Sequence, residues 1–338
     1  MPDEPRRILI VKPTALGDVV QSLPVAGLLK RRWPEATIDW LIARPFAPLL
    51  ETHPHVDDVL LFDRHRDAGP RVQARATRRL VAQLRSRGYD LAIDLQGLFR
   101  SGWLTRRSRA RRRVGFAYAR EGASLFYNDR VARRPGARNA AERYLDVAEH
   151  LGCGRSPASA DIVTTDADDA AAAKLIEPLD DRPFVLMLPG TNWRTKRWPA
   201  EHFARLSEVL GMKHGLECVV AGAGDAVDAA TLIGGLNVVN RTSVRELASL
   251  MKHASLVIAN DSGPMHLAAA LHRPLVALFG PTDPHLTGPH GSARSVVRLD
   301  VSCAPCFSRS CVHRTCLVGL SVEACARRCA DVLELERA

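Results

Sequence analysis

The sequence predicts an α/β protein with two domains, each built on a mostly parallel sheet. Short apolar runs that fit buried strands alternate with helical stretches through both halves of the chain, which is typical of βαβα units. A stretch that mixes Ser, Pro and Asp, between about residues 154 and 182, separates the halves. With 338 residues and 46% hydrophobic composition, the chain can form two cores. We place the domains at residues 1–170 and 171–320, followed by a C-terminal helix at 321–338.

The composition restricts the partners that the protein can have. No apolar run reaches the roughly 20 residues of a membrane span, and the N-terminus leads into a predicted strand without a secretory signal, so we expect a cytoplasmic protein. The net charge of +10 favours nucleic acid, anionic lipid or a phosphorylated substrate as partner, unless the arginines reflect codon bias alone. No nucleic-acid-binding motif is found, and aromatic residues make up only 5%, so nucleic acid is not expected.

The first half opens with a βα unit. A strand at Ile8–Val11 leads through a polar turn, Lys12–Asp18, into a helix predicted over Val19–Arg31. A second helix is predicted over Asn139–Leu151, and helical connections are expected between the strands. The further strands of this half are predicted at Ile38–Ile42, Val56–Phe62, Leu91–Leu95, Val114–Phe116 and Phe126–Val131.

Asp18 stands at the start of the first helix, near the carboxyl end of the first strand. Ligands of open α/β sheets bind at the carboxyl ends of the strands. As an acid in a first helical turn, Asp18 complements the helix dipole and needs no further role. As a general base, it would face a cleft. Its position alone leaves both interpretations open.

Arginines crowd two stretches of the first half. Residues 64–87 contain eight arginines and a single acid, Asp67, and further arginines follow between Arg100 and Arg113. Such a run forms either a solvated face or a basic rim that takes an anionic acceptor and rests on anionic lipid.

The second half repeats the alternation of strand and helix. Helices are predicted from Pro199 through Leu210 and over Val244–His253. The strands are predicted at Phe184–Leu188, Cys218–Ala221, Val238–Val239, Leu256–Ala259 and Leu275–Phe279.

The stretch Asn260–Leu271, NDSGPMHLAAAL, is the most informative turn of this half. It joins a strand to a helix, and Pro264 after Gly263 is tolerated in a first helical turn because its missing N–H would have no partner there. The N-terminus of such a helix can bind a phosphate. Asp261 and Ser262 are then either helix caps only or part of a ligand site. His266 on the first turns could reach the ligand or be a structural histidine.

Two other strand ends of this half carry glycine, hydroxyl and charged residues. Lys196 supplies a positive charge, Thr191 and Asn192 supply hydrogen bonds, and Asp225 could accept ribose hydroxyls. This convergence predicts a nucleotide donor in the second domain, with Asp18 of the first domain across a cleft. The pattern suits transfer of a group from a nucleoside diphosphate to a hydroxyl.

Several of these stretches together resemble the ADP-heptose:lipopolysaccharide heptosyltransferases of glycosyltransferase family 9. The similar stretches include ILIVKPTALGDVVQSLPV, YDLAIDLQGLFRSG, REGASLFYNDRV, TKRWP, NDSGPMHLAAAL and FGPTDP, and they are most like the heptosyltransferase I branch. The cysteine-rich tail, CAPCFSRSCVHRTC, looks like tails of the heptosyltransferase II branch. The resemblance covers about residues 7–320.

The resemblance implies a GT-B architecture, in which two Rossmann-like domains face each other across a cleft and the C-terminal helix packs back towards the first domain. It implies inverting transfer of heptose from ADP-heptose to a Kdo-bearing lipid A core, without metal or other cofactor, at the inner face of the inner membrane. By matched position, Asp18 corresponds to the catalytic base, and Lys196 assists at the diphosphate. Thr191, Asn192, Asp261, Ser262 and Gly263 match donor-binding positions, and Arg64, Arg66 and Arg120 fall near the acceptor side. Asp225, Pro264 and His266 are further donor-binding candidates from their places at the strand ends and the helix start.

Three alternatives stay open at this point. The fold could serve another GT-B nucleotide-sugar enzyme or an epimerase. The charge alone could mark a protein that binds nucleic acid or anionic membrane. Finally, six of the eight cysteines lie in the tail, where Cys303, Cys306, Cys311, Cys316 and His313 could form a metal or redox module.

Overall fold

The chain divides into two compact units, Met1–Val163 and Thr164–Ala338, and each is described by itself. The computed structural model describes residues 4–63, 69–136, 139–156 and 159–335, without the side chains of Asp225 and Ala293. The division falls close to the boundary that the sequence predicts at residue 170. It assigns helix α7 (Asp166–Ile176), which crosses that boundary, entirely to the second unit.

Within its described residues, the first unit forms a six-stranded sheet in the order β3-β2-β1-β4-β5-β6, and each pair of neighbouring strands runs parallel. This is the strand order of a doubly wound Rossmann domain. All carboxyl ends therefore meet at one edge. The strands are β1 (Arg7–Val11), β2 (Thr37–Ile42), β3 (Asp58–Leu61), β4 (Leu91–Asp94), β5 (Arg112–Phe116) and β6 (Asp129–Val131).

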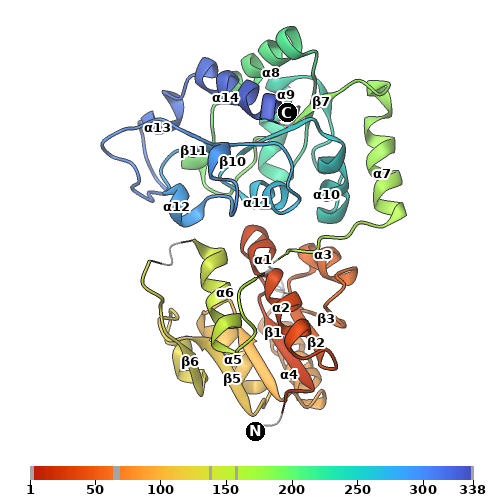
Figure 1. The fold of residues 1–338 in the computed structure, drawn as a ribbon, viewed down its shortest axis with the longest axis vertical. Coiled ribbons are helices and arrows are strands. Elements are labelled where there is room, and N and C mark those ends of the chain that lie inside the picture. Colours follow the sequence, from red (N-terminus) through yellow and green to blue (C-terminus); the bar gives the residue numbers. More distant parts are fainter. Residues whose placement is uncertain (1–3, 64–68, 137–138, 157–158, 336–338) are drawn as a thin grey trace. The chain divides into compact units, whose positions relative to one another are not determined.

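Helices cover both faces of this sheet because its strands are apolar on both sides. In β1, Ile8 and Ile10 belong to one core cluster, whereas Leu9 and Val11 belong to another. The first cluster includes α1 (Leu16–Ser22), α2 (Pro24–Arg32) and α6 (Ala140–His150), which lie side by side in Figure 1. The second includes α4 (Pro70–Ser86) and α5 (Phe99–Arg107). The short α3 (Pro48–Glu51) follows β2.

The predicted single helix over Val19–Arg31 is wrong in one respect. The structure places two helices there, α1 beginning at Leu16 and α2 beginning at Pro24. Pro24 has no N–H to donate to the preceding turn, so the first helix ends and the proline becomes the first residue of the next. The helix predicted over Asn139–Leu151 is confirmed as α6. The Asn139 side chain caps it by accepting from the Ala141 N–H at 2.9 Å.

The described part of the second unit repeats the same sheet, in the order β12-β11-β10-β7-β8-β9. Four of its predicted strands are confirmed to within one residue. The strand predicted at Val238–Val239 is wrong in position, because β9 ends at Asn237, and the edge strand β12 was missed. The strands are β7 (Phe184–Leu188), β8 (Glu217–Val220), β9 (Leu236–Asn237), β10 (Leu256–Asn260), β11 (Leu275–Phe279) and β12 (Val296–Arg298). The helices after α7 are α8 (Ala200–His214), α9 (Val227–Ile233), α10 (Val244–His253), α11 (Gly263–Ala270), α12 (Pro284–Thr287), α13 (Thr315–Val318) and α14 (Val322–Leu335).

The C-terminal helix α14 packs on α8, β11 and β12 of its own unit. Cys325 and Cys329 lie on its buried side with no exposed surface, and burial raises the pKa of the Cys325 thiol to about 12. These two cysteines are therefore core residues that stay protonated. The predicted packing of this helix towards the first domain concerns the placement of the two units, and it stays a prediction.

Candidate active site

Asp18 lies in the first turn of α1, directly beyond the carboxyl end of β1. Its side chain is 40% exposed, so it can meet a substrate. The Tyr144 hydroxyl donates to Asp18 Oδ1 at 3.0 Å, and Lys12 Nζ lies 3.6 Å from Asp18 Oδ2. One oxygen of the carboxylate is thus oriented by a hydrogen bond, and the other lies beside a cation.

Lys12 is a site residue that the sequence analysis did not single out. It directly follows β1, and only 2% of its surface is exposed. Burial lowers the pKa of Lys12, and the carboxylates of Asp18 and Asp94 oppose that shift. Burial also raises the pKa of Tyr144 well above its usual range, so Tyr144 remains a hydrogen-bond donor at neutral pH. Its position directly after a predicted strand is the feature of the sequence that could have identified Lys12 as a site residue.

The buried carboxylate of Asp94 fixes the neighbouring strand end. It accepts hydrogen bonds from Tyr127 Oη at 2.7 Å and from the N–H groups of Gln96 at 2.8 Å and Gly97 at 3.0 Å. Burial raises the pKa of Asp94, and these donors work against the shift. Gln96 Oε1 in turn accepts from the Thr14 N–H at 3.1 Å. The turns after β4 and β1 are therefore tied together beside Asp18.

A cavity of about 350 Å³ lies in front of Asp18. Lys12 and Tyr144 line it together with three arginines, Arg120, Arg133 and Arg143. The Arg143 Nε is buried and has no hydrogen-bond partner within the described residues. This cavity therefore combines a carboxylate with a basic wall that suits an anionic ligand. Arg120 was predicted from the sequence, whereas Arg133 and Arg143 were not.

The predicted acceptor residues Arg64 and Arg66 lie outside the described residues.

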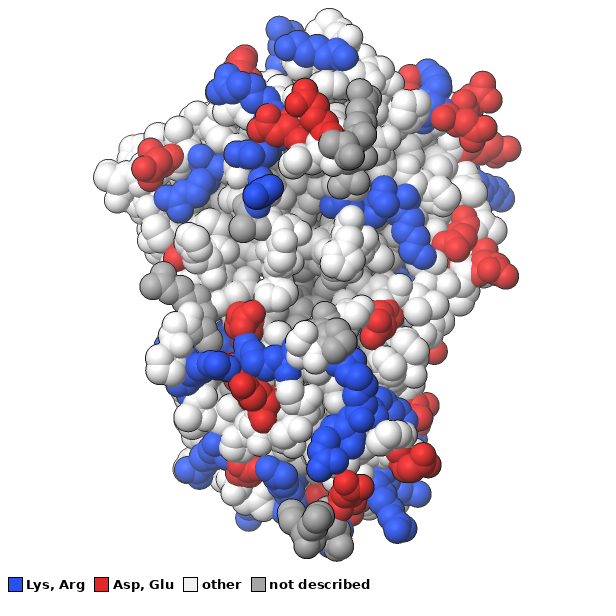
Figure 2. Space-filling model, viewed as in Figure 1, with Lys and Arg blue, Asp and Glu red and all other residues white. Residues whose placement is uncertain are grey.

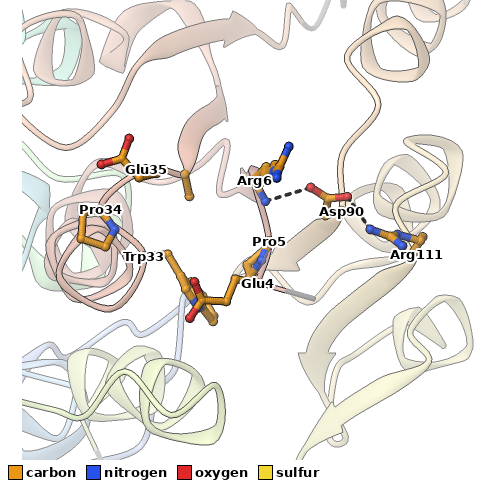
Figure 3. Close-up of a pocket in the computed structure, with 9 residues that line it drawn as sticks. Glu4, Pro5, Arg6, Trp33, Pro34, Glu35, Asp90 and Arg111 are labelled. Carbon is orange, nitrogen blue, oxygen red and sulfur yellow. Dashed lines mark hydrogen bonds and ion pairs between the residues drawn. The ribbon is translucent and has the colours of Figure 1, made fainter. Parts of the chain in front are cut away.

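Another cavity of the first unit, of about 530 Å³, lies at the opposite edge of the sheet (Figure 3). Asp90 accepts there from the Arg6 N–H at 2.9 Å and pairs with Arg111 at 2.9 Å. Arg6 and Asp90 immediately precede β1 and β4, so this cavity is at the amino ends of the strands. Because ligands of such sheets bind at the carboxyl ends, it is not the candidate site.

In the second unit, Asp261 holds Lys196 in place. Asp261 Oδ2 lies 2.7 Å from Lys196 Nζ and accepts from the Thr282 hydroxyl at 2.5 Å and the Thr287 hydroxyl at 3.3 Å. Only 4% of the Asp261 surface is exposed. The interpretation of Asp261 as a helix cap is therefore wrong, because its carboxylate forms an ion pair with Lys196 and accepts hydrogen bonds from the two threonines. Thr282 and Thr287 were not predicted, although Thr282 follows β11 in the GPTDP loop.

The neighbouring strand ends are joined to this pair by hydrogen bonds. Asn260 Nδ2 donates to the Pro189 carbonyl at 2.7 Å, and Thr191 Oγ1 donates to the Asp261 carbonyl at 3.4 Å. Lys196 Nζ lies 4.6 Å from the ring centroid of Trp193, a cation–π distance. The ends of β7 and β10 thus position the ammonium group together.

The helix α11 begins at Gly263, with Pro264 in its first turn and Ser262 as its N-cap residue. The Ser262 side chain makes no capping hydrogen bond, so the first of the two interpretations left open by the sequence does not hold for it. Its hydroxyl is buried and lacks a hydrogen-bond partner within the described residues. His266 is buried, with 8% of its surface exposed. An uncapped helix N-terminus beside a buried hydroxyl is a suitable anion site.

Two further predicted donor residues follow the ends of β7 and β8. Asn192 is exposed in the bend after β7. Asp225 belongs to the short 3₁₀ helix Gly224–Ala226 after β8, and its side chain lies outside the described part of the chain.

The tail cysteines form a loose group. Cys303, Cys306 and Cys311 are exposed free thiols, whereas Cys316 is buried. Burial, and then the neighbouring thiols, raise the pKa of Cys316. Across the residues that the structure describes, no three His, Cys, Asp or Glu side chains are arranged to hold a metal ion.

The fold is that of a two-domain α/β protein with a partly exposed carboxylate in one unit and, in the other, an uncapped helix N-terminus beside a buried hydroxyl. The family model of glycosyltransferase family 9 (heptosyltransferase) matches residues 77–316. The chain belongs to glycosyltransferase family 9, and it is a glycosyltransferase with two Rossmann-like domains of the GT-B type.

The relatives include both heptosyltransferase types. Lipopolysaccharide heptosyltransferase 1 of Pseudomonas aeruginosa is 32% identical over 318 residues, covering 91% of this chain and 88% of the relative. The structure of the E. coli heptosyltransferase WaaC with ADP is 28% identical, with a TM-score of 0.77 and coverage of 96% and 99%. That of the E. coli ADP-heptose LPS heptosyltransferase II is 24% identical, with a TM-score of 0.80 and coverage of 98% and 100%. None of the described helices has both the length and the apolar character needed to span a membrane.

Proposed function

We propose that the protein is an inverting heptosyltransferase that moves heptose from ADP-heptose to the Kdo/heptose inner core of lipopolysaccharide. Membership of the family supports the reaction class. The observation that carries the proposal is Asp18, a partly exposed carboxylate that Tyr144 orients and that lies beside the buried Lys12. A carboxylate held in this way is suited to take a proton from an acceptor hydroxyl.

In the proposed reaction, Asp18 removes the proton of the acceptor hydroxyl as its oxygen attacks C1 of the heptose. The new C1–O bond forms on the face opposite the diphosphate, while the bond from C1 to the phosphate oxygen breaks and ADP leaves with the electron pair. Lys12 stabilises the ionised form of Asp18 before the transfer. The configuration at C1 is inverted because a single displacement occurs.

The departing ADP gains negative charge, which the second unit can stabilise. Lys196 supplies a cation, and the N-terminus of α11 supplies N–H groups and the buried Ser262 hydroxyl. We assign Asp261 the role of a positioning residue that holds Lys196. Gly263, Pro264 and His266 belong to the same helix start, and Thr191, Asn192 and Asp225 are proposed donor contacts. No metal or cofactor is assigned to the reaction.

The acceptor is anionic, because Kdo carries a carboxylate. Arg120, Arg133 and Arg143 line the cavity in front of Asp18, and the buried Nε of Arg143 is suited to such a group. Arg64 and Arg66 are proposed to extend this contact. The arginine-rich surface of the first unit is further proposed to rest on the anionic inner membrane surface, with the protein at its cytoplasmic face.

The test is to offer ADP-heptose with Kdo-lipid A acceptors, with and without one heptose already attached, and to follow ADP and product mass. Transfer to the first acceptor only would identify addition of the first heptose, and transfer to the second only would identify addition of the second. Asp18→Asn should lower kcat by about 10²- to 10⁴-fold and leave the Kd of ADP-heptose unchanged. Asp166→Asn, at an exposed position of α7, is the control. Full activity of Asp18→Asn, or an isomerised donor without ADP release, would refute the proposal.

A further inference from the structure

The loop between β12 and α13, residues 299–314, lies against the proposed donor site of the second unit. We call it the cysteine loop, because it contains the three exposed cysteines. The N–H groups of Cys306 and Phe307 both donate to the Pro281 carbonyl, at 2.9 and 2.8 Å. Pro281 directly precedes Thr282 of the site. The cysteine loop is therefore fixed to the turn that follows β11.

A second contact ties the cysteine loop to the turn after β7. The Thr195 hydroxyl donates to the Ser308 carbonyl at 2.8 Å, and Thr195 directly precedes Lys196. Just beyond the loop, Cys316 packs on Gly280, where an added methyl group would lie 3.2 Å from the sulfur. The loop is thus held against two of the strand ends that form the proposed donor site.

Arg309 extends from this loop to the same aromatic ring that Lys196 contacts. Arg309 Cζ lies 4.5 Å from the ring centroid of Trp193, and Lys196 Nζ lies 4.6 Å from it. Both are cation–π distances, and they place the two charges at most about 9 Å apart. Arg309 is exposed, and its guanidinium forms no ion pair with a carboxylate of the residues that the structure describes. Its charge is therefore open to a ligand.

The pair of Lys196 and Asp261 offers a ligand no net charge. Lys196 Nζ lies 2.7 Å from Asp261 Oδ2, so the carboxylate offsets the ammonium group. The N-terminus of α11 supplies only partial charge, whereas the diphosphate of a nucleotide sugar carries more than one negative charge. On the face of the second unit that Figure 2 shows, Lys and Arg side chains are interspersed with Asp and Glu side chains. A diphosphate there needs an individually placed second cation.

We propose that Arg309 binds the diphosphate of the donor together with Lys196, so that the cysteine loop forms part of the donor site. This inference rests on the proposed function, because it takes the donor to be a nucleoside-diphosphate sugar. Charge-assisted hydrogen bonds are about 2.8 Å long, so the oxygens of one diphosphate can bridge two cations that are at most about 9 Å apart. The planar guanidinium can also donate two parallel hydrogen bonds to one phosphoryl group.

Calorimetric binding of ADP tests this assignment. Arg309→Gln should raise the Kd of ADP about tenfold, because charge-assisted hydrogen bonds to a phosphate are lost. Arg309→Lys keeps the charge and should bind ADP to within about threefold of the unsubstituted protein. Arg205→Gln is the matched control and should bind ADP normally, because it removes another exposed arginine of the same unit, on α8, whose side chain is 67% exposed. An unchanged Kd in Arg309→Gln would overturn the proposal, even with a lower thermal midpoint, because Arg309 would then only pack on Trp193.

Inorganic pyrophosphate removes the nucleoside from the test. It should compete with ADP for the unsubstituted protein, and Arg309→Gln should weaken its binding by the same factor as that of ADP. A loss confined to ADP would assign Arg309 to the nucleoside and overturn the proposal. A failure of pyrophosphate to bind the unsubstituted protein would overturn it as well.

Transfer assays separate this inference from the proposed function. Arg309→Gln should raise KM for ADP-heptose about tenfold, for the same reason as it weakens ADP. If the unsubstituted protein transfers heptose and the variant keeps its KM, the proposed function stands and the inference about Arg309 fails. If the unsubstituted protein binds ADP and pyrophosphate but transfers no heptose, the proposed function fails, and calorimetry still decides whether Arg309 binds the diphosphate.

Discussion

The buried Lys12 offers the sharpest test of how Asp18 works. Lys12→Met keeps the length of the side chain and removes its charge, so packing around β1 should be nearly unchanged. With the cation gone, the ionised form of Asp18 loses its neighbour at 3.6 Å. We therefore expect the acid limb of the kcat/KM profile to move to higher pH, because protonation of the base becomes easier.

The size of this shift follows from the geometry. Two unit charges 3.6 Å apart attract by about 4 to 5 kcal/mol at an effective dielectric constant of 20. The Asp18 side chain is 40% exposed, and solvent screening reduces this to about 1 to 2 kcal/mol. Since 1.36 kcal/mol corresponds to one pH unit, the acid limb should move by about one unit. Tyr144→Phe, which removes one hydrogen bond to Oδ1, should move it in the same direction by less.

The assay is ADP release at saturating ADP-heptose, measured between pH 5 and pH 9, with the thermal midpoint of each variant as a check on folding. Lys30→Met is the matched control, because Lys30 pairs with Asp57 at 3.0 Å, at a distance from the site. The reasoning is refuted if Lys12→Met leaves the acid limb in place while activity persists. In that case burial, which lowers the pKa of Lys12, would have left the amine uncharged at the working pH.

Three further predictions concern other residues. Asp261→Asn should weaken ADP-heptose binding about tenfold by releasing Lys196, and an unchanged Kd would contradict the positioning role. Burial lowers the pKa of His53 from 6.5 to about 4, so the first unit should lose up to about 3 kcal/mol of unfolding free energy as the pH falls from 6.5 to 4. In urea titrations, His53→Gln should reduce the dependence of the unfolding free energy on pH. If the unfolding free energy of the variant depends on pH as steeply as before, His53 is not the cause of that dependence. Gly115→Ala would place a methyl group in the ring of Tyr127 and should cost about 1 to 3 kcal/mol in the same titration, against no loss for Gly69→Ala, which has open space.

The fold was predictable because it depends on patterns that neighbouring residues carry. The run Phe184–Leu188 is apolar throughout, and it forms a strand buried on both faces with the predicted bounds. The helix Val244–His253 also has its predicted bounds, since Ser243 and Glu246 form a capping box at its start. The prediction of a single helix after β1 was wrong because the apolar periodicity continues across Leu23 and Pro24, so the pattern does not mark where the first helix ends.

The site was predictable only where a single turn contains it. Asp261 follows β10 directly and Asp18 lies at the end of the turn after β1, so their position at the carboxyl ends could be inferred from the sequence. The residues that donate hydrogen bonds to these two carboxylates could not be inferred from it. Tyr144 reaches Asp18 from a helix 126 residues further along the chain, and Thr282 reaches Asp261 from another strand end. Such contacts depend on how helices pack on the sheet, which no local pattern specifies.

Ser262 distinguishes a ligand site from a helix cap, the two interpretations that the sequence left open. A hydroxyl that is buried without a partner lowers stability, typically by about 1 to 3 kcal/mol, and a bound phosphate would accept its hydrogen bond. Ser262→Ala should therefore stabilise the ligand-free protein and destabilise its complex with ADP. Without ligand, the variant should be as stable as the unsubstituted protein or more stable, by up to about 1 kcal/mol, whereas its affinity for ADP should fall about five- to tenfold. A capping residue gives the reverse result, since its loss costs about 1 kcal/mol of stability and leaves ADP binding unchanged. Thermal midpoints measured with and without saturating ADP separate the two, and a destabilised variant that binds ADP normally would return Ser262 to the role of a cap.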